Sequence, residues 1–168
     1  MGARSRLRAR LRLHMNDAGA ALVEFALALP LFLLLVFGLI EFGRYVAVST
    51  AVETASREAA RYASAVGGTP PQYTDCDAIR NAGQDLSVIT DIDQIDIDYD
   101  TGPPGTVPLG VDCDGIDNLP TATDIASGDR VVVTATETFE SVVPIIGDII
   151  GTVTITSTDS RTIFKGDL

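Results

Sequence analysis

Residues 18–40 read AGAALVEFALALPLFLLLVFGLI, and this stretch decides how the chain is built. It carries one charged side chain, Glu24, and an α-helix needs about 20 consecutive apolar residues to cross a bilayer. The apolar region of a cleavable secretory signal is only about 7–15 residues long, so this run is too long for that class of signal. We therefore predict a single membrane-spanning helix near the N-terminus.

The charges that flank the span predict its orientation. Five of the chain's 12 lysines and arginines are arginines within the first 12 residues, and Glu41 directly follows the span. Because basic residues are retained on the cytoplasmic side, we expect a cytoplasmic N-terminus and an extracytoplasmic chain after about Tyr45. Met15 is an alternative start to Met1, and starting there removes these arginines and weakens the argument. The sequence leaves both starts open.

Glu24 is the unusual residue of the span, because a charge at mid-bilayer costs about 2.5–3.5 kcal/mol on insertion scales. One interpretation is that Glu24 lies near the cytoplasmic interface and reaches water. In the other, the chain is cut after Gly19, which makes Ala20 the first residue and Glu24 the fifth. The new α-amine of Ala20 can then pair with Glu24 of the same or a neighbouring chain. Such a pair offsets much of the desolvation cost of both charges.

Four residues fit the signature of prepilin peptidase substrates: Gly19 at the end of a charged leader, the small Ala20 after the cut, Glu24 at the fifth place and Phe25 at the sixth. The surrounding sequence resembles the TadE-like domain of minor pseudopilins from the tight-adherence (Flp) type IV pilus machinery. The matching features are VEFAL at 23–27, Pro30, GLIEFGR at 38–44 and REAARYA at 57–63. The resemblance is dense over residues 19–65 and thin beyond them.

This resemblance implies a pilin-like α+β fold, in which a long N-terminal helix, transmembrane in its first half, precedes a small, mostly antiparallel β-sheet head. We expect a basic leader peptide at 1–19, a transmembrane and extended amphipathic helix at 20–66, and an extracytoplasmic β-rich head at 67–168. The implied function is pilus assembly or adhesion, from the cytoplasmic membrane or within a surface pilus. The implied partners are a prepilin peptidase, other pilins or pseudopilins, the assembly platform and the lipid bilayer.

The alternative function is that of an uncleaved, signal-anchored envelope protein with an adhesive or partner-binding β-head. That class of protein predicts no cleavage and indifference to substitution of Glu24. A third class, an anchored enzyme or sensor, needs a pocket that the sequence does not show. We therefore expect no enzymatic activity: His14 in the leader is the only histidine, and no nucleophile elbow or phosphate-binding glycine loop occurs.

An apolar stripe extends the helix beyond the membrane. Glu53 and Arg57 lie four residues apart on the opposite, charged face, and GGTPP at 67–71 ends the helix. We expect the stripe to pack on the sheet of the head, with an intermolecular coiled-coil seam as the alternative, although Ala and Val make a weak seam. The stripe repeats at steps of three and four: Val48, Val52, Ala55, Ala59, Tyr62 and Val66.

Alternating Val, Ile, Tyr and Thr predict three strands in the head, at 94–100, 130–139 and 151–163. Residues 101–127 are rich in Gly, Pro and Asp and are expected to form a long surface excursion. The segment SVVPIIGDIIG at 141–151 is expected to be a loop that caps the core. The alternative for this segment is a short amphipathic turn that dips toward the membrane or a partner.

A short helix is expected to open the head. Asp77 is its predicted N-cap, and Ile79, Ala82 and Leu86 share one face. Gly83 argues against the helix, because glycine destabilises helix interiors.

Cys76 and Cys113 both fall in the segment predicted to be extracytoplasmic, where thiols oxidise. A disulfide between them is the favoured interpretation, and closing its loop contributes about 3–4 kcal/mol. The alternative, a Cys/His metal site, lacks ligands because the one histidine lies in the leader.

The aspartates at 96, 98 and 100 have the one-three-five spacing of a calcium loop. Thr101 and Val107 stand where that loop needs Gly and a bidentate Glu, so the motif is incomplete. A second acidic loop, also without the full pattern, contains Asp112, Asp114, Asp117 and Asn118. We interpret these carboxylates as a solvated strand face and predict no metal and no cofactor.

The overall charge argues against nucleic acid as a partner. The chain has 23 acidic and 12 basic residues and no Trp. Phosphate binding needs clustered Lys and Arg, and beyond the leader the chain is strongly acidic.

Overall fold

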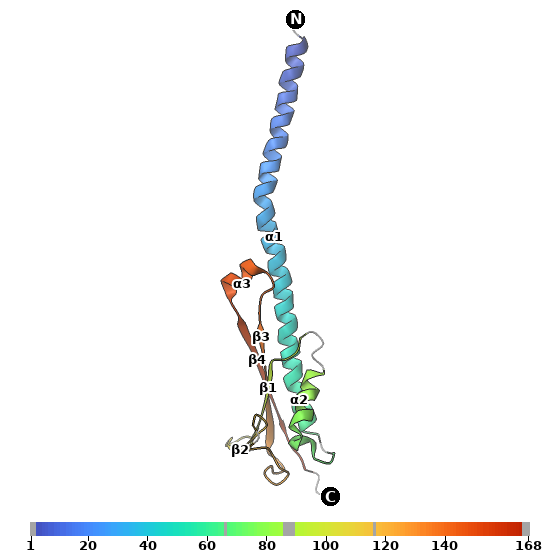
Figure 1. Ribbon diagram of the computed structural model, residues 1–168, viewed down its shortest axis with the longest axis vertical. Helices are drawn as coiled ribbons and strands as arrows, with labels where there is room; N and C mark the ends of the chain where they lie inside the picture. The colour runs from blue at the N-terminus through green and yellow to red at the C-terminus, as the bar shows by residue number, and fades with distance from the viewer. Residues whose placement is uncertain (1–2, 66, 86–89, 116, 166–168) are drawn as a thin grey trace. The chain divides into compact units, whose positions relative to one another are not determined.

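The computed structural model describes residues 3–65, 67–85, 90–115 and 117–165 (Figure 1), of which 3–18 are described as helical backbone only. The chain divides into two compact units, Met1–Phe42 and Gly43–Leu168, and helix α1 contributes to both. The elements, in chain order, are α1 (Ala3–Ala63), the 3-10 turn η1 (Gln72–Thr74), α2 (Cys76–Gln84), β1 (Gln94–Asp100), β2 (Pro108–Asp112), β3 (Arg130–Phe139), α3 (Pro144–Ile150) and β4 (Val153–Thr162).

The first unit is the N-terminal part of α1, which continues through Pro30. By length and composition, α1 is apolar enough to cross a membrane, with a mean hydropathy of 2.6 over an 18-residue window whose residues are all unburied. Leu27, Leu31 and Leu35 are each at least two-thirds exposed. A helix that presents apolar side chains in this way suits an apolar environment, which suggests a membrane anchor. The predicted long apolar helix is confirmed.

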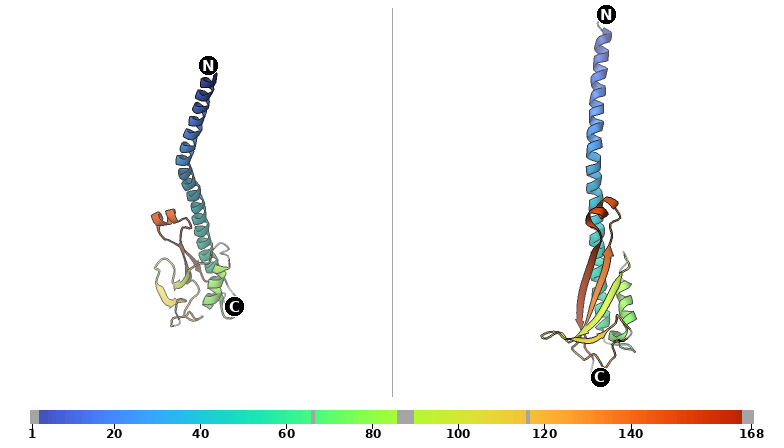
Figure 2. Two further views of the ribbon diagram at one scale, coloured as in Figure 1. Left: turned by 45° about the horizontal axis from the view of Figure 1, so that its top comes forward. Right: turned by 60° about the vertical axis from the view of Figure 1, so that its left-hand side comes forward.

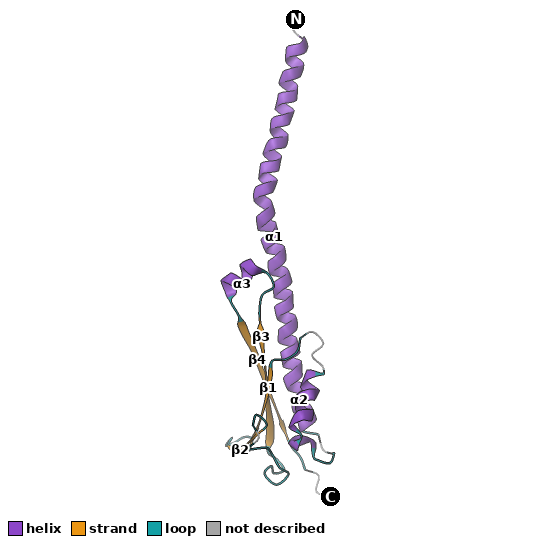
Figure 3. Cartoon of the chain, in the orientation of Figure 1, coloured by secondary structure: helices purple, strands orange, loops and turns teal. Residues whose placement is uncertain are grey.

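The second unit contains a four-stranded antiparallel sheet with the order β2-β1-β3-β4. Figure 3 shows the strands as one layer, with α1 and α2 as helices beside it. β3 and β4 pair along their whole length, from Arg130 opposite Thr162 to Phe139 opposite Val153. The predicted α+β fold with a mostly antiparallel sheet is confirmed, and the three predicted strands correspond to β1, β3 and β4.

The core of the second unit lies between α1 and the sheet (Figure 2). Val52, Ala55 and Ala59 of the predicted stripe are fully buried, and Tyr62 is half-buried; Val66 lies outside the described residues. The stripe is therefore core of this chain, as expected, and not a free seam. Across the interface, the apolar side chains of the strands alternate inward: Ile95, Ile97, Tyr99, Val131, Val133 and Ala135.

The helix predicted near Asp77 exists as α2, but its N-cap is Asp75. The Asp75 carboxylate accepts a hydrogen bond from the Ala78 N–H at 3.0 Å, which satisfies one of the free donors of the first turn. Asp77 lies inside that turn, where its charge favours the positive end of the helix dipole. The register of the buried face shifts accordingly, to Cys76, Ile79 and Gly83. Ala82 is half-buried, and Leu86 lies outside the described residues.

Gly83 is a point of close approach between α2 and its neighbours. A Cβ at this position would lie 2.8 Å from Ile95 Cδ1, 3.2 Å from the Ala55 carbonyl oxygen and 3.4 Å from Ala59 Cβ. The glycine that argued against a helix is therefore what lets this helix pack on α1 and β1.

Gly83→Val is expected to lower the free energy of unfolding by about 1–3 kcal/mol, because the added side chain overpacks a site bounded by backbone. Ala82→Val on the same helix is the matched control and should cost less than about 1 kcal/mol, mainly through helix propensity. Urea unfolding of the full chain in detergent measures both. Equal losses in the two variants would contradict the packing role of Gly83.

Two segments predicted as loops contain regular structure. The excursion at 101–127 includes β2, whose residues Asp112 and Pro108 pair with Asp98 and Asp100. Pro108 and Gly110 break the alternation that reveals strands, and proline is tolerated there because β2 is an edge strand.

The expected core-capping loop at 141–151 is instead mostly helix α3. Pro144 occupies its first turn, and Gly151, with φ of 66°, ends it. Ile149 is 75% exposed and Ile150 is 47% exposed, so the segment does not cap the core.

Candidate functional site

The residues predicted for processing lie together on α1 in the first unit. Gly19, Ala20, Glu24 and Phe25 are all exposed, and a Cβ added at Gly19 would meet no atom within 4 Å. Ala20 and Glu24 are four residues apart and therefore share one helix face. Because helical side chains lean toward the N-terminus, the Glu24 carboxylate lies on the side of Ala20. This arrangement suits a pair between Glu24 and an amine created at Ala20.

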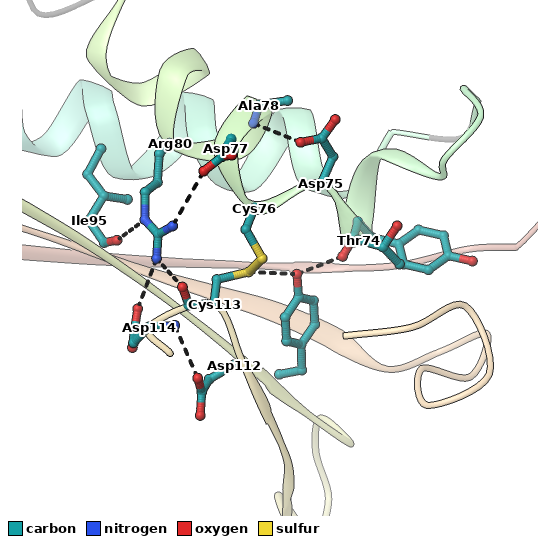
Figure 4. Close-up of a disulfide and its surroundings, with 12 residues drawn as sticks. Thr74, Asp75, Cys76, Asp77, Ala78, Arg80, Ile95, Asp112, Cys113 and Asp114 are labelled. Carbon is teal, nitrogen blue, oxygen red and sulfur yellow. Dashed lines mark hydrogen bonds and ion pairs between the residues drawn. A yellow bond between two sulfur atoms is a disulfide. The ribbon is translucent and has the colours of Figure 1, made fainter. Parts of the chain in front are cut away.

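The two cysteines of the second unit are joined by a disulfide (Figure 4). Cys76 is the first residue of α2, Cys113 directly follows β2, and their Cα atoms are 5.6 Å apart. Both residues are almost completely buried. The bond therefore ties α2 covalently to the edge of the sheet.

Arg80 stabilises the end of the head that contains the disulfide. Sequence reasoning did not identify this residue. Its guanidinium donates hydrogen bonds to the carbonyls of Ile95 and Cys113 and pairs with Asp114 at 3.4 Å (Figure 4). Arg80 is the only Lys or Arg between Arg61 and Arg130. That isolation in an acidic segment is the signal that could have revealed its role.

Tyr99 is the second residue of this network that sequence reasoning missed. Its hydroxyl donates a hydrogen bond to the Tyr73 carbonyl at 2.6 Å and lies near the Cys113 sulfur. A phenol is already protonated at neutral pH, and burial raises the pKa of Tyr99 further, so the hydroxyl remains a donor in more alkaline solution as well. The hydrogen bond links β1 to η1, directly ahead of the disulfide.

Asp100 corrects the prediction that the three aspartates of β1 form a solvated face. It is buried and forms a bidentate pair with Arg130, its partner on β3, with N–O distances of 2.8 and 2.7 Å. The Arg130 hydrogen bonds lower the pKa of the Asp100 carboxyl, and the Gly102 N–H adds to this effect. Asp98 does face solvent, and Asp96 is half-buried.

The N-terminal helix decides the relationship of this chain to known proteins. Residues 19–61 match the TadE-like protein family. The match spans 43 of the 168 residues and confirms the resemblance found in the sequence. No curated protein and no solved structure matches the chain.

The TadE-like segment begins at Gly19, the last residue before the predicted cut. It includes all four processing residues and the apolar helix, which suggests a membrane anchor. Its other end, Arg61, lies in the part of α1 that packs with the sheet and pairs there with Glu58. The TadE-like segment therefore runs from the apolar part of α1 into the part that contributes to the core of the second unit.

A surface depression of about 530 Å³ adjoins the disulfide and is lined in part by Asp75, Asp77 and Arg80. Within the described residues no histidine faces it, and no group of three or more His, Cys, Asp or Glu side chains could hold a metal ion. The described residues that line the depression are therefore partly charged and include no recognisable catalytic set.

The aspartates considered for calcium lie across the β1–β2 ladder from one another. Asp98 stands directly opposite Asp112, and like charges at such positions destabilise a sheet. Desolvation, then repulsion from Asp114, Asp112 and Asp96, raises the pKa of the Asp98 carboxyl. Desolvation and Asp96 likewise raise the pKa of the Asp114 carboxyl, despite the opposing effect of Arg80.

Asp98→Asn is expected to raise the free energy of unfolding by about 0.2–1 kcal/mol at pH 7. The pKa of Asp98 is higher in the folded than in the unfolded chain. The folded state therefore favours the protonated carboxyl, and stability is lost as the pH rises through that raised pKa. The gain should shrink as the pH falls toward 3 and as salt screens the charges. Urea unfolding at several pH values measures it, and a gain that persists at pH 3 would rule out this electrostatic cause.

Proposed function

We propose that the chain is a minor pseudopilin-like component of a tight-adherence (type IVb/Flp) pilus system that a prepilin peptidase cuts after Gly19. The observation that carries the proposal is that the TadE-like match begins at Gly19 and contains the exposed residues Ala20, Glu24 and Phe25 of the processing signature. The chain acts in pilus assembly or adhesion and catalyses no reaction.

The proposed topology places the basic leader in the cytoplasm and the head, residues 67–168, outside the cytoplasmic membrane. The arginine-rich N-terminus supports this orientation. The Cys76–Cys113 disulfide supports an oxidising compartment for the head. The proposed partners are the prepilin peptidase, other pilins or pseudopilins and the assembly platform.

In this function Glu24 acts after cleavage. The new α-amine of Ala20 pairs with Glu24 of its own or a neighbouring chain, and the neighbouring case gives one subunit a defined register against the next. Each charge offsets part of the other's cost of burial in an apolar medium. Membrane insertion alone does not need this pair.

The test is Glu24→Val, expressed in cells that lack their own copy of the chain. We expect normal insertion, because the substitution removes the one charge within 18–40, but loss of most surface pili. Glu53→Ala is the matched control, since Glu53 is an exposed residue of α1 that pairs with Arg57 one turn away. Pili are counted by electron microscopy. Normal piliation by the Glu24 variant would count heavily against the proposal.

The second candidate function is that of an uncleaved, signal-anchored envelope protein whose head binds a partner. The depression beside the disulfide is the observation that favours it. This candidate predicts a full-length chain in the presence of active peptidase and no effect of Glu24→Val.

A further inference from the structure

Helix α3 lies at one end of the sheet. Along the chain, this end is the one nearest to the apolar span. Phe139, the last residue of β3, packs edge-on against Tyr45 with ring centroids 5.6 Å apart, and the Arg44 guanidinium lies 5.2 Å from the Phe139 ring. Tyr45 follows Phe42, the end of the first unit, by three residues. Consecutive Cα atoms are about 3.8 Å apart, so at most about 11 Å of chain separates Phe42 from this end of the head.

Exposed apolar side chains gather at this same end. Figure 1 shows α3 at the end of the sheet where β3 ends and β4 begins, with β2 toward the other end. Among the described residues of the second unit, five of eight exposed large apolar side chains belong to α3, its N-terminal flank or the first turn of α1 in this unit. They are Tyr45, Val46, Val142, Ile149 and Ile150, with exposed fractions from 38% to 75%.

The composition of this patch fits a bilayer surface. Aromatic and aliphatic side chains are enriched where a membrane protein meets the headgroups. α3 itself carries Asp148 and no Lys or Arg, and Asp148 is exposed. A carboxylate is costly in hydrocarbon, so α3 belongs at the boundary of headgroups and acyl chains with Asp148 in water. Without basic residues its binding depends on apolar contact and not on anionic lipid.

We propose that α3 and Val142 rest on the bilayer that holds the chain's own span. The proposal rests on the membrane anchoring given under the proposed function. The continuous helix α1 connects this end of the head to the span and so, under the proposed function, to a bilayer. Contact at α3 adds a second point of attachment and holds the head in a defined orientation on the membrane before assembly.

The chain has no Trp, so a single introduced Trp reports its own surroundings. Ile149→Trp, in the full chain reconstituted into phosphatidylcholine vesicles, tests the contact by emission wavelength and by quenching with brominated acyl chains. Val107→Trp is the matched control, because Val107 is 57% exposed and lies on the loop before β2. Leu34→Trp reports on the span itself. Ile150→Trp repeats the test at the neighbouring exposed residue.

We expect the Ile149→Trp variant to emit at shorter wavelength than the Val107→Trp control. Brominated lipid should quench it less than the Leu34→Trp variant but more than the control. Equal behaviour of Ile149→Trp and Val107→Trp, with the span variant quenched, would overturn the α3 contact and leave the anchor standing.

Two other outcomes are also decisive. A blue shift in the Ile149→Trp variant without lipid quenching would mean that protein covers α3, and it would overturn the contact as well. An unquenched Leu34→Trp variant would overturn the anchor and the α3 contact together.

Discussion

Gly19→Leu is expected to leave the chain at full length when it is expressed with its prepilin peptidase, whereas the unchanged chain loses every residue up to and including Gly19. Glycine lets another backbone approach closely, and the peptidase must reach the bond after residue 19. A Cβ at Gly19 meets nothing within 4 Å, so the substitution has no clash that would disturb the fold. Failure of processing would therefore report on recognition by the peptidase. Gel mobility and mass spectrometry of membrane extracts measure the conversion.

Gly38→Leu is the matched control for this experiment. Gly38 lies on the same helix, and a Cβ there also meets no atom within 4 Å. The control gains the same side chain away from the cut and should be processed like the unchanged chain. Conversion of the Gly19 variant at the rate of this control would contradict the assignment of the cleavage site.

Loss of the disulfide is expected to have the largest effect on the stability of the head. The bond closes a loop of 37 residues, which corresponds to about 4 kcal/mol by loop-closure entropy. The double variant Cys76→Ser/Cys113→Ser should therefore unfold at a temperature lower by roughly 10–20 °C. Near-ultraviolet circular dichroism of the full chain in detergent follows the loss of packing around buried Tyr99.

A reductant supplies the control for the disulfide. Dithiothreitol should lower the unfolding temperature of the unchanged chain to that of the double variant and should leave the variant unaffected. An equal effect of reductant on both proteins would mean that it acts elsewhere. A double variant as stable as the oxidised chain would show that Arg80 and the core hold this end of the head without the bond.

Local patterns in the sequence were enough to predict helix α1. Length and hydropathy predict the span, and the repeat of three and four residues predicts the buried face that contains Val52, Ala55 and Ala59. The strands β1, β3 and β4 follow from their alternation in the same way. In each case the pattern is carried by residues that are neighbours along the chain.

The features that the sequence did not predict depend on contacts between segments that are distant along the chain. Asp100 is buried only because Arg130 stands opposite it on β3, and Arg80 reaches carbonyls on β1 and after β2. Pairing with β1 stabilises β2 as an edge strand, although the Pro and Gly residues of β2 disfavour strand structure. The sequence alone does not show which cationic side chain lies opposite which carboxylate in the folded chain.

The functional features likewise divide into those that local sequence predicts and those that depend on distant contacts. The processing residues form a local motif on one helix, and the TadE-like family match begins at its Gly19. The exposure of α3 depends on where the β3–β4 connection lies relative to Tyr45. The contact that places it joins residues almost one hundred positions apart, and alternation and hydropathy do not predict such a contact.

The most direct test of the central claim is the intact mass and N-terminal sequence of the unmodified chain, extracted from membranes that contain its prepilin peptidase. We predict a mature chain that begins at Ala20, with Glu24 as its fifth residue and the Cys76–Cys113 bond retained. A chain that still begins at Met1 or Met15 in the presence of active peptidase would contradict the pseudopilin assignment and favour the uncleaved anchor.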